Sequence, residues 1–181
     1  MSFTIRLATA ADIPALVPVM DAAITQNQRE FLSVSEIESS RASMGLDQQL
    51  IEDGTYYVVL CDGDVAGCGG WSRRATLYGG DHSAGRDNGL LDPSRDPARV
   101  RAMYTHPDFT RRGVGRLVLE TCELAAAREG FTRLELMASL SGRPLYEACG
   151  FESVEETEDA AGGVPVPLVR MQKSMSPRLG P

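Results

Sequence analysis

Apolar and polar residues recur with two different periods along this chain, and the period predicts the type of each element. Alternation with a period of two, or runs rich in Val and Tyr, indicate strands over residues 3–8, 55–61, 65–72, 98–105, 133–137, 151–156 and 166–172. Apolar residues at helical spacing indicate helices over residues 12–27, 33–44, 114–130 and 141–148. The pattern therefore predicts an α/β protein without internal repeats.

One unit of this pattern also predicts strand direction. The strand of residues 98–105, the helix of residues 114–130 and the strand of residues 133–137 are spaced as in a right-handed crossover between parallel strands. Ligands of such sheets bind outside the carboxyl ends of the strands, beside the N-terminus of the crossover helix. Residues 110–116 occupy that position, so they are the first candidates for a binding site.

Two glycine-rich segments interrupt the pattern. Glycines 67, 69 and 70 lie inside a predicted strand, where they indicate a bulge or the close approach of another backbone. Residues 73–97 have no period at all and contain several glycines and an Asp-Pro turn, so they form a loop too long for an ordinary hairpin. Loops of this size are often functional, and the alternative is a surface excursion without a role.

Composition narrows the class of protein. The 181 residues, 43% of them hydrophobic, suit one domain, predicted over residues 1–173 with a disordered tail at 174–181. No apolar run is long enough to cross a bilayer and no signal-like segment begins the chain, so a cytoplasmic protein without membrane contact is expected. A net charge of -7 argues against nucleic-acid binding. The four cysteines lack metal-ligand spacing, so we expect buried free thiols and no metal.

The segment 110–116, with sequence TRRGVGR, has the features of an anion-binding turn. A helix N-terminus carries unpaired N–H groups and partial positive charge, and glycines allow its backbone to approach a ligand closely. The segment therefore predicts a phosphate or pyrophosphate site, although arginines facing solvent at an ordinary junction would give the same pattern. It matches neither the P-loop nor the dinucleotide fingerprint, since Val118 stands where the latter has its third glycine.

A second motif follows about thirty residues later, with Leu145-Tyr146 and then Gly150-Phe151. The two motifs in this order resemble those of the GNAT superfamily of acyl-CoA-dependent N-acyltransferases. The resemblance implies a mixed, mostly antiparallel central sheet with a parallel central strand pair splayed around acyl-CoA, and helices on both faces. Thr110 departs from the Gln or Arg that is usual in the family, and Ser139 stands where many relatives have Asn.

The resemblance also implies roles for individual residues. The backbone of Met103, Tyr104 and Thr105 would pair with the pantetheine arm, and a bulge near Tyr104 would aim an N–H at the thioester carbonyl. The diphosphate would be held by Arg111, Arg112, Gly113, Val114, Gly115 and Arg116. Ser139 would hydrogen-bond a pantetheine amide, and Tyr146 would be the general acid. Ordinary core packing is the alternative for the side chains of Met103, Tyr104 and Tyr146.

The sequence offers weaker candidates for a catalytic base and for further ligand contacts. His82, Asp81, Glu36, Glu38 and His106 are candidates for a base, although deprotonation through water would need none of them. Arg143 could approach a phosphate of CoA. Arg73, Arg74 and Trp71 are expected to have structural roles rather than catalytic or binding ones. We expect residues 31–44 and 73–97 to shape the pocket for the acceptor.

The leading hypothesis is an N-acetyltransferase that moves an acetyl group from acetyl-CoA to a primary amine of a small molecule or peptide. A non-catalytic module that senses acyl-CoA is the alternative, and a binder of another nucleotide phosphate is a third possibility. A homodimer is compatible with the implied fold. The acceptor itself is not indicated by the sequence.

Overall fold

A computed structural model describes residues 2–176 of the chain. Helices and strands alternate along it as follows: β1 Phe3–Leu7, α1 Ile13–Gln26, α2 Val34–Ser40, α3 Gln48–Glu52, β2 Tyr56–Cys61, β3 Asp64–Ser72, β4 Ala98–Thr105, α4 Val114–Arg128, β5 Arg133–Ser139, α5 Arg143–Ala148, β6 Glu152–Asp159 and β7 Val166–Ser174. Short 3-10 turns precede α1 (Ala10–Asp12) and follow β4 (Pro107–Phe109). None of the helices within residues 2–176 has the length and apolarity needed to span a membrane.

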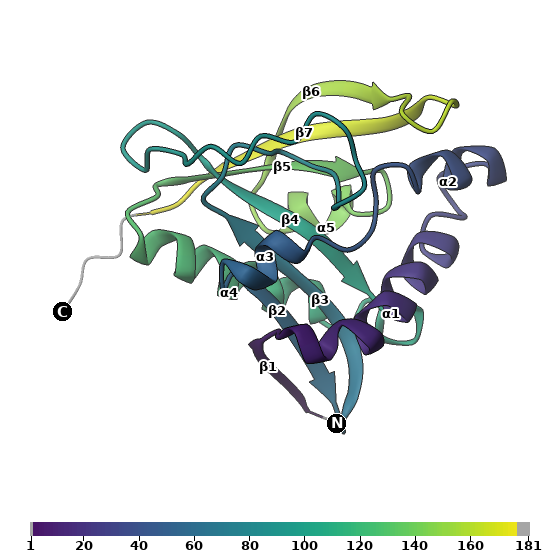
Figure 1. The fold of residues 1–181 in the computed structure, drawn as a ribbon, viewed down its shortest axis with the longest axis horizontal. Helices are drawn as coiled ribbons and strands as arrows, with labels where there is room; N and C mark the ends of the chain where they lie inside the picture. Colours follow the sequence, from purple (N-terminus) through teal and green to yellow (C-terminus); the bar gives the residue numbers. More distant parts are fainter. Residues whose placement is uncertain (1, 177–181) are drawn as a thin grey trace.

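The described strands form one mixed sheet in the order β1-β2-β3-β4-β5-β7-β6, and its strands diverge in the middle (Figure 1). Neighbouring strands are antiparallel except for the central pair β4 and β5. Those two strands are in register at Ala98 with Leu134 and at Arg99 with Glu135. Beyond these pairs β4 and β5 separate, so the edge of β4 that faces β5 opens toward its carboxyl end. The splayed parallel pair and the mostly antiparallel sheet are confirmed.

The sheet carries a hydrophobic core on each face, because helices cover both faces (Figure 1). On one face α1 buries Leu16, Met20, Ala23 and Ile24, which recur at helical spacing. On the other face α4 buries a stripe that runs from Val114 to Ala126. The predicted helices on both faces are therefore confirmed.

The glycines of β3 allow α4 and β4 to approach closely. A Cβ on Gly67 would lie 2.6 Å from Cγ1 of Val114, and one on Gly69 would lie 2.3 Å from Sδ of Met103. The register of β3 with β4 also shifts between Cys68 and Gly70, which is a β-bulge. Both expectations for these glycines, a bulge and a close approach, are confirmed.

The helix predicted over residues 33–44 is shorter in the structure. A capping box between Ser33 and Glu36 starts α2, as the sequence indicates, but α2 ends at Ser40. A separate helix, α3, follows, and its first N–H donates to Oδ1 of Asp81 at 2.9 Å. Because that contact comes from a distant segment, local periodicity did not reveal α3.

The C-terminal part also differs from the prediction. Residues 157–159, expected in a link, continue β6, whose residues are nearly all exposed and so have no apolar alternation. The predicted disordered tail begins too early, since Ser174 ends β7 and Met175 is buried with its N–H donating to the carbonyl of Thr132. The rest of the predicted tail, residues 177–181, lies outside the described residues.

Candidate active site

The loop between β4 and α4 forms an anion-binding concavity. Arg111 has a φ of 62° and Gly113 has a φ of 90°, so two left-handed residues alternate with right-handed or extended ones. Successive N–H groups in such a conformation point to one side, where they bind anions. The N-terminus of the 15-residue helix α4 adds its unpaired N–H groups and partial positive charge. The chemistry of this loop suits a phosphate or diphosphate.

A groove of about 750 Å³ runs from this loop along β4 to α5. Ten of the residues assigned to the cofactor or to catalysis line it: Met103, Tyr104, Thr105, Arg111, Gly113, Val114, Gly115, Arg116, Ser139 and Tyr146. They come from four elements that the fold brings together. The structure thus brings these ten residues together along one groove.

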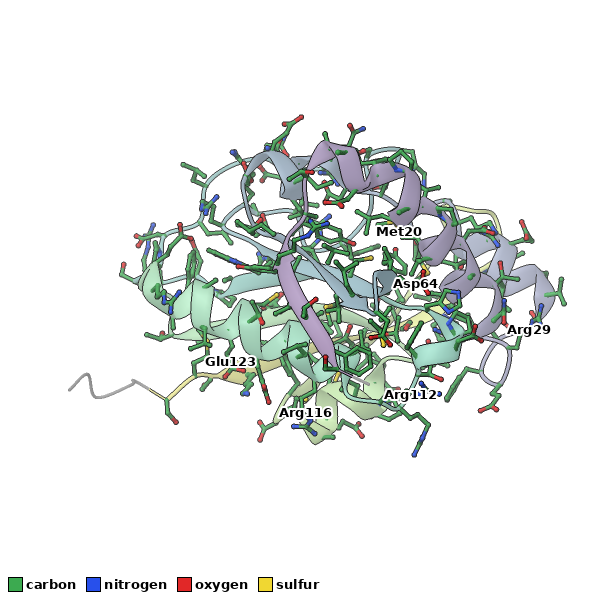
Figure 2. All side chains as sticks on the ribbon, turned by 90° about the horizontal axis from the view of Figure 1, so that it is seen from below. Met20, Arg29, Asp64, Arg112, Arg116 and Glu123 are labelled. Atoms are coloured by element: carbon green, nitrogen blue, oxygen red, sulfur yellow. The ribbon has the colours of Figure 1, made fainter. Side chains whose placement is uncertain are left out.

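Arg112 is the predicted residue that does not line the groove. Its guanidinium lies 5.7 Å from the ring centroid of Phe109, in a cation–π geometry. Figure 2 places the side chains of Arg112 and Arg116 at the same edge of the molecule, near the start of α4. Arg112 lies between the two left-handed residues Arg111 and Gly113. Its expected contact with a cofactor gains no support.

The carboxyl half of β4 is irregular as well as open. Residues Ala102 and Met103 stand opposite Gly69, and Ala102 has a φ of 51°. The hydroxyl of Tyr56 donates to the carbonyl of Ala102 at 2.8 Å, which holds this bulge. The bulge thus lies one to two residues before Tyr104, close to its expected position. At the end of the strand Asn27 donates to the carbonyl of Thr105, so that oxygen is partly engaged.

Tyr146 lies where the groove reaches the core. Its ring packs edge-on against Phe151 at 5.9 Å, and its side chain is largely buried. None of the hydrogen bonds found within residues 2–176 involves its hydroxyl. Burial raises the pKa of the Tyr146 phenol above its ordinary value. The group therefore keeps its proton at neutral pH and can donate it to a leaving group.

The side chains of Tyr104 and Ser139 are engaged by the protein. The hydroxyl of Tyr104 accepts the N–H of Gly45 at 2.8 Å, and burial raises its pKa. Oγ of Ser139 accepts the N–H of Gly142 at 3.2 Å and lies 3.1 Å from Oγ of Ser141. Tyr104 thus serves the packing that was considered as its alternative role. Ser139 keeps an oxygen at the groove with capacity for one more hydrogen bond.

A second cavity of about 110 Å³ adjoins the groove, and we name it the acceptor cavity after the role that we propose for it. Six residues line both spaces, which makes them the junction: Gln28, Met44, Met103, Tyr104, Ser139 and Tyr146. Ser40 to Gly45 and Leu77 to Gly80 form two of its walls. Apart from Gly45, these residues lie in the ranges 31–44 and 73–97, which were expected to shape the acceptor pocket.

A buried ion cluster fixes the wall that residues 73–97 contribute. Arg101, on β4, donates to Oδ2 of Asp47 at 2.7 Å and to the carbonyl of Thr76 at 3.0 Å. Arg86, inside the long loop, donates to Oδ1 of Asp47 at 3.0 Å. Both arginines also donate to the carbonyl of Gly79. Burial outweighs the charge of Asp47 and lowers the pKa of Arg101. The long loop is therefore held as a cavity wall.

Sequence reasoning missed the polar groups of the acceptor cavity. Asp159, Ser43 and Tyr78 line it, and the hydroxyl of Ser43 donates to Oδ2 of Asp159. Burial and the negative charge of Asp159 raise the pKa of Tyr78. Gln28 is 2% exposed and also lines the cavity. These residues come from four separate segments without a common motif, so the sequence carries no local signal for them.

The five candidate bases all have structural contacts instead, and none lines either space. Asp81 accepts from Gln48, and Nε2 of His82 lies 2.7 Å from the carbonyl of Arg41. Nδ1 of His106 accepts the N–H of Asp108. Glu36 belongs to the capping box of α2, and Glu38 pairs with Arg41. Their candidacy as a base finds no support in the geometry.

The remaining candidate residues also make structural contacts. Arg73 pairs with Glu129 and Arg74 pairs with Asp53, as the structural interpretation predicts. Arg143 pairs with Glu147 at 2.7 Å rather than facing the groove. Trp71 is buried against Phe131 and does not line the cavity. The cysteines are free, and Cys61, Cys68 and Cys122 are buried. No cluster of three potential metal-binding side chains occurs within residues 2–176.

Comparison with known families decides which fold family this is. Residues 52–153, more than half of the chain, match the family model described as an acetyltransferase (GNAT) domain. The chain belongs to the GNAT acetyltransferase family. The matched range includes β4, the loop of residues 110–116 and Tyr146, which are the parts that form the groove. No curated protein sequence matches the chain.

Solved GNAT structures share the fold across the whole chain. A GCN5-related N-acetyltransferase from Rhodopseudomonas palustris is 19% identical, with a TM-score of 0.72 over 97% of each chain. PaiA N-acetyltransferase from Thermoplasma acidophilum, solved with coenzyme A, is 16% identical, with a TM-score of 0.65 over 96% of this chain and 99% of the other. YncA from Salmonella typhimurium, solved with acetyl-CoA, is 20% identical, with a TM-score of 0.64 over 100% and 98%. At these identities the likeness establishes the fold.

Proposed function

We propose that this protein transfers an acetyl group from acetyl-CoA to a primary amine. One observation carries the proposal: an anion-binding loop, an open strand edge and a buried tyrosine line a single groove that meets a second cavity at Tyr146. A diphosphate, an extended amide-bearing arm and a thioester follow one another in acetyl-CoA in the same order. Membership of the GNAT acetyltransferase family supports the same activity.

The cofactor would be bound mainly by backbone groups. The N–H groups of the loop from Arg111 to Arg116 face the diphosphate, and the side chains of Arg111 and Arg116 add positive charge. The pantetheine arm would lie along the edge of β4 that β5 leaves open, pairing with Met103 and Tyr104 as an added strand. This arrangement brings the thioester to the junction with the acceptor cavity.

The reaction would proceed by direct attack at that junction. The amine nitrogen forms a bond to the thioester carbonyl carbon, and an N–H from the bulge of Ala102 and Met103 stabilises the negative oxygen. When the carbon–sulfur bond breaks, the sulfur takes a proton from Tyr146 and leaves as the thiol of CoA. The amine loses one proton and the tyrosine is reprotonated, both through water, because none of the five candidate bases lines the cavity.

Tyr146→Phe tests this assignment because it removes the proton donor and little else. The ring of phenylalanine keeps the packing against Phe151, and none of the hydrogen bonds found within residues 2–176 is lost. We expect unchanged affinity for acetyl-CoA by titration calorimetry and a fall in kcat of about 100-fold. Tyr57→Phe is the control, since Tyr57 is half-buried on β2 and lines neither space.

Turnover is measured as release of the CoA thiol across a panel of primary amines. Acetylated product from at least one amine supports the proposal. Tight binding of acetyl-CoA without turnover of any amine would favour a sensor and contradict it. Absence of CoA binding by the folded protein would contradict both the acetyltransferase and the sensor hypotheses. If Tyr146→Phe turns over as fast as the wild type, Tyr146 is not the acid.

A further inference from the structure

The acceptor cavity contains a carboxylate that no basic side chain neutralises. Asp159, at the end of β6, accepts from the hydroxyl of Ser43 and from the N–H of Ala161. No ion pair of Asp159 with Lys, Arg or His occurs within the described residues 2–176. A carboxylate has about four acceptor positions, so these two donors orient it and leave capacity for a ligand. Its charge is therefore available to whatever fills the cavity.

Gln28, which also lines this cavity, carries a second acceptor. Oε1 of Gln28 is buried and has no hydrogen bond within the described part of the chain. The orientation of the amide is fixed, because Nε2 donates to the carbonyl of Ile24, which can only accept. An unpaired buried carbonyl is unfavourable by about 1–3 kcal/mol, so the site favours a ligand that donates an N–H there. Gln28 lies at the junction between the two spaces.

The register of the sheet gives the separation of Asp159 from Ser139 at the junction. Ser139, at the junction, pairs with Leu168 on β7, and Leu168 pairs with Thr157 on β6. Asp159 lies two residues beyond Thr157, which puts it roughly 12 Å from Ser139. A carboxylate at that depth does not reach the nitrogen that attacks at the junction. After the reach of the Asp159 side chain and a hydrogen bond, roughly 6 Å remain, the length of a short aliphatic chain.

Arg101 also lies at this cavity, and its positive charge would favour an anionic ligand over a cationic one. However, its guanidinium is already bonded to Asp47 and to the carbonyls of Thr76 and Gly79. Its side chain is 3% exposed. Side chains such as Val100, Leu136 and Leu168 give the cavity apolar walls between its two ends. The charge that the cavity offers to a ligand is therefore the negative charge of Asp159, and the carbonyl of Gln28 adds an acceptor at the junction.

We propose that the acceptor is a short aliphatic amine with a second cationic group at its far end, bound by Asp159, while Gln28 accepts an N–H of the reacting amine. The proposal rests on the acetyltransferase function and adds the substrate class. The cationic group would displace water from Asp159, the chain would lie along the apolar walls, and the free amine would meet the thioester beside Tyr146.

Three probe amines with the same terminal amine and chain length separate the alternatives. Diaminobutane carries a distal ammonium, butylamine carries a methyl group, and 4-aminobutanoate carries a carboxylate. We expect kcat/KM for diaminobutane to exceed that for butylamine by about tenfold or more, which corresponds to 1.4 kcal/mol. 4-Aminobutanoate is expected to be the poorest of the three. Equal values for diaminobutane and butylamine, or a preference for 4-aminobutanoate, would overturn the proposal.

Two variants assign the preference to residues. Asp159→Asn keeps one oxygen but removes the charge, so it should abolish the advantage of diaminobutane over butylamine. Glu158→Gln is the matched control, because Glu158 is the exposed neighbour on β6 and does not line the cavity. Gln28→Leu should lower turnover of all three probes alike. A loss confined to diaminobutane would overturn the assignment of Gln28 to the reacting amine.

Binding of diaminobutane to the CoA-loaded protein gives a readout that does not depend on turnover. Calorimetry should detect it for the wild type and for Glu158→Gln, with affinity reduced about tenfold or more in Asp159→Asn. Acetylation of butylamine without preference for diaminobutane would contradict this inference but would still support the proposed function. Failure to bind CoA, or to acetylate any amine, would contradict the proposed function itself.

Discussion

Asp47→Asn should destabilise the protein strongly, because it breaks the buried ion cluster behind the acceptor cavity. Asp47 is 1% exposed and receives hydrogen bonds from Arg101 at 2.7 Å and from Arg86 at 3.0 Å. Its replacement leaves the buried guanidinium of Arg101 without a counter-charge. Removing one partner of a buried pair costs about 3–5 kcal/mol. We expect a loss of about 3 kcal/mol, because the carbonyls of Thr76 and Gly79 still accept from Arg101.

Equilibrium unfolding in urea, followed by far-ultraviolet circular dichroism, measures this loss. For a chain of this size a loss of about 3 kcal/mol corresponds to a fall in Tm of roughly 6–12 °C. The exposed pair of Asp21 with Arg41 supplies the control, since Asp21→Asn should cost less than about 1 kcal/mol. The KM for an amine should rise in Asp47→Asn, because the loop of residues 73–97 loses its attachment beside the cavity.

A double-mutant cycle separates the ion cluster from local packing. Arg101→Met alone leaves Asp47 paired with Arg86, and the double variant Asp47→Asn with Arg101→Met removes both buried charges at the centre. The double variant should be more stable than the sum of the single losses predicts, by at least about 1 kcal/mol. Additive losses, or a loss below about 1 kcal/mol in Asp47→Asn, would refute the view that this cluster holds the wall.

Two further predictions concern α5 and pH. Gly115→Val would place a Cβ 2.5 Å from Cδ2 of Leu145, so the Leu145 side chain, next to Tyr146, must move. We expect kcat to fall about tenfold or more, while exposed Ala127→Val on the same helix leaves it unchanged. A wild-type kcat in Gly115→Val would contradict this. Hydrogen bonds from Arg6 lower the pKa of Asp12, so Asp12 stabilises the fold above its unfolded pKa of about 4 and loses that contribution as pH falls. The Tm difference between wild type and Asp12→Asn should therefore narrow from about pH 6 to about pH 3, and a constant difference would contradict it.

Sequence reasoning succeeded where the signal is local. The strand of residues 98–105, the loop after it and the helix that begins at Val114 follow from periodicity, glycine positions and a few arginines within one short segment. The motif of Tyr146 and Gly150-Phe151 then indicated the family, which the family match confirms. The splay of β4 from β5 came with the resemblance rather than from the residues of either strand.

Sequence reasoning failed where contacts between distant segments determine the local structure. Helix α3 depends on Asp81, which follows it by some thirty residues, and β6 carries polar residues because it is an exposed edge strand. Arg112 has the same type and loop position as Arg111, and the backbone conformation separates them. Asp159 looked like part of a solvated acidic link because its neighbours are acidic and exposed.

The two halves of this site draw on different parts of the chain and meet at the junction residues that line both spaces. The cofactor half is built largely from one continuous segment, from Met103 to Arg116, whose backbone supplies most of the proposed contacts. The acceptor half is assembled from side chains that include those of Gln28, just after α1, of the loops beside α2 and β3, and of the end of β6. A substitution at Asp159 can therefore change which amine fits without moving the groups that would hold CoA. Such a division predicts that affinity for CoA stays constant in Asp159→Asn, which abolishes the preference for diaminobutane.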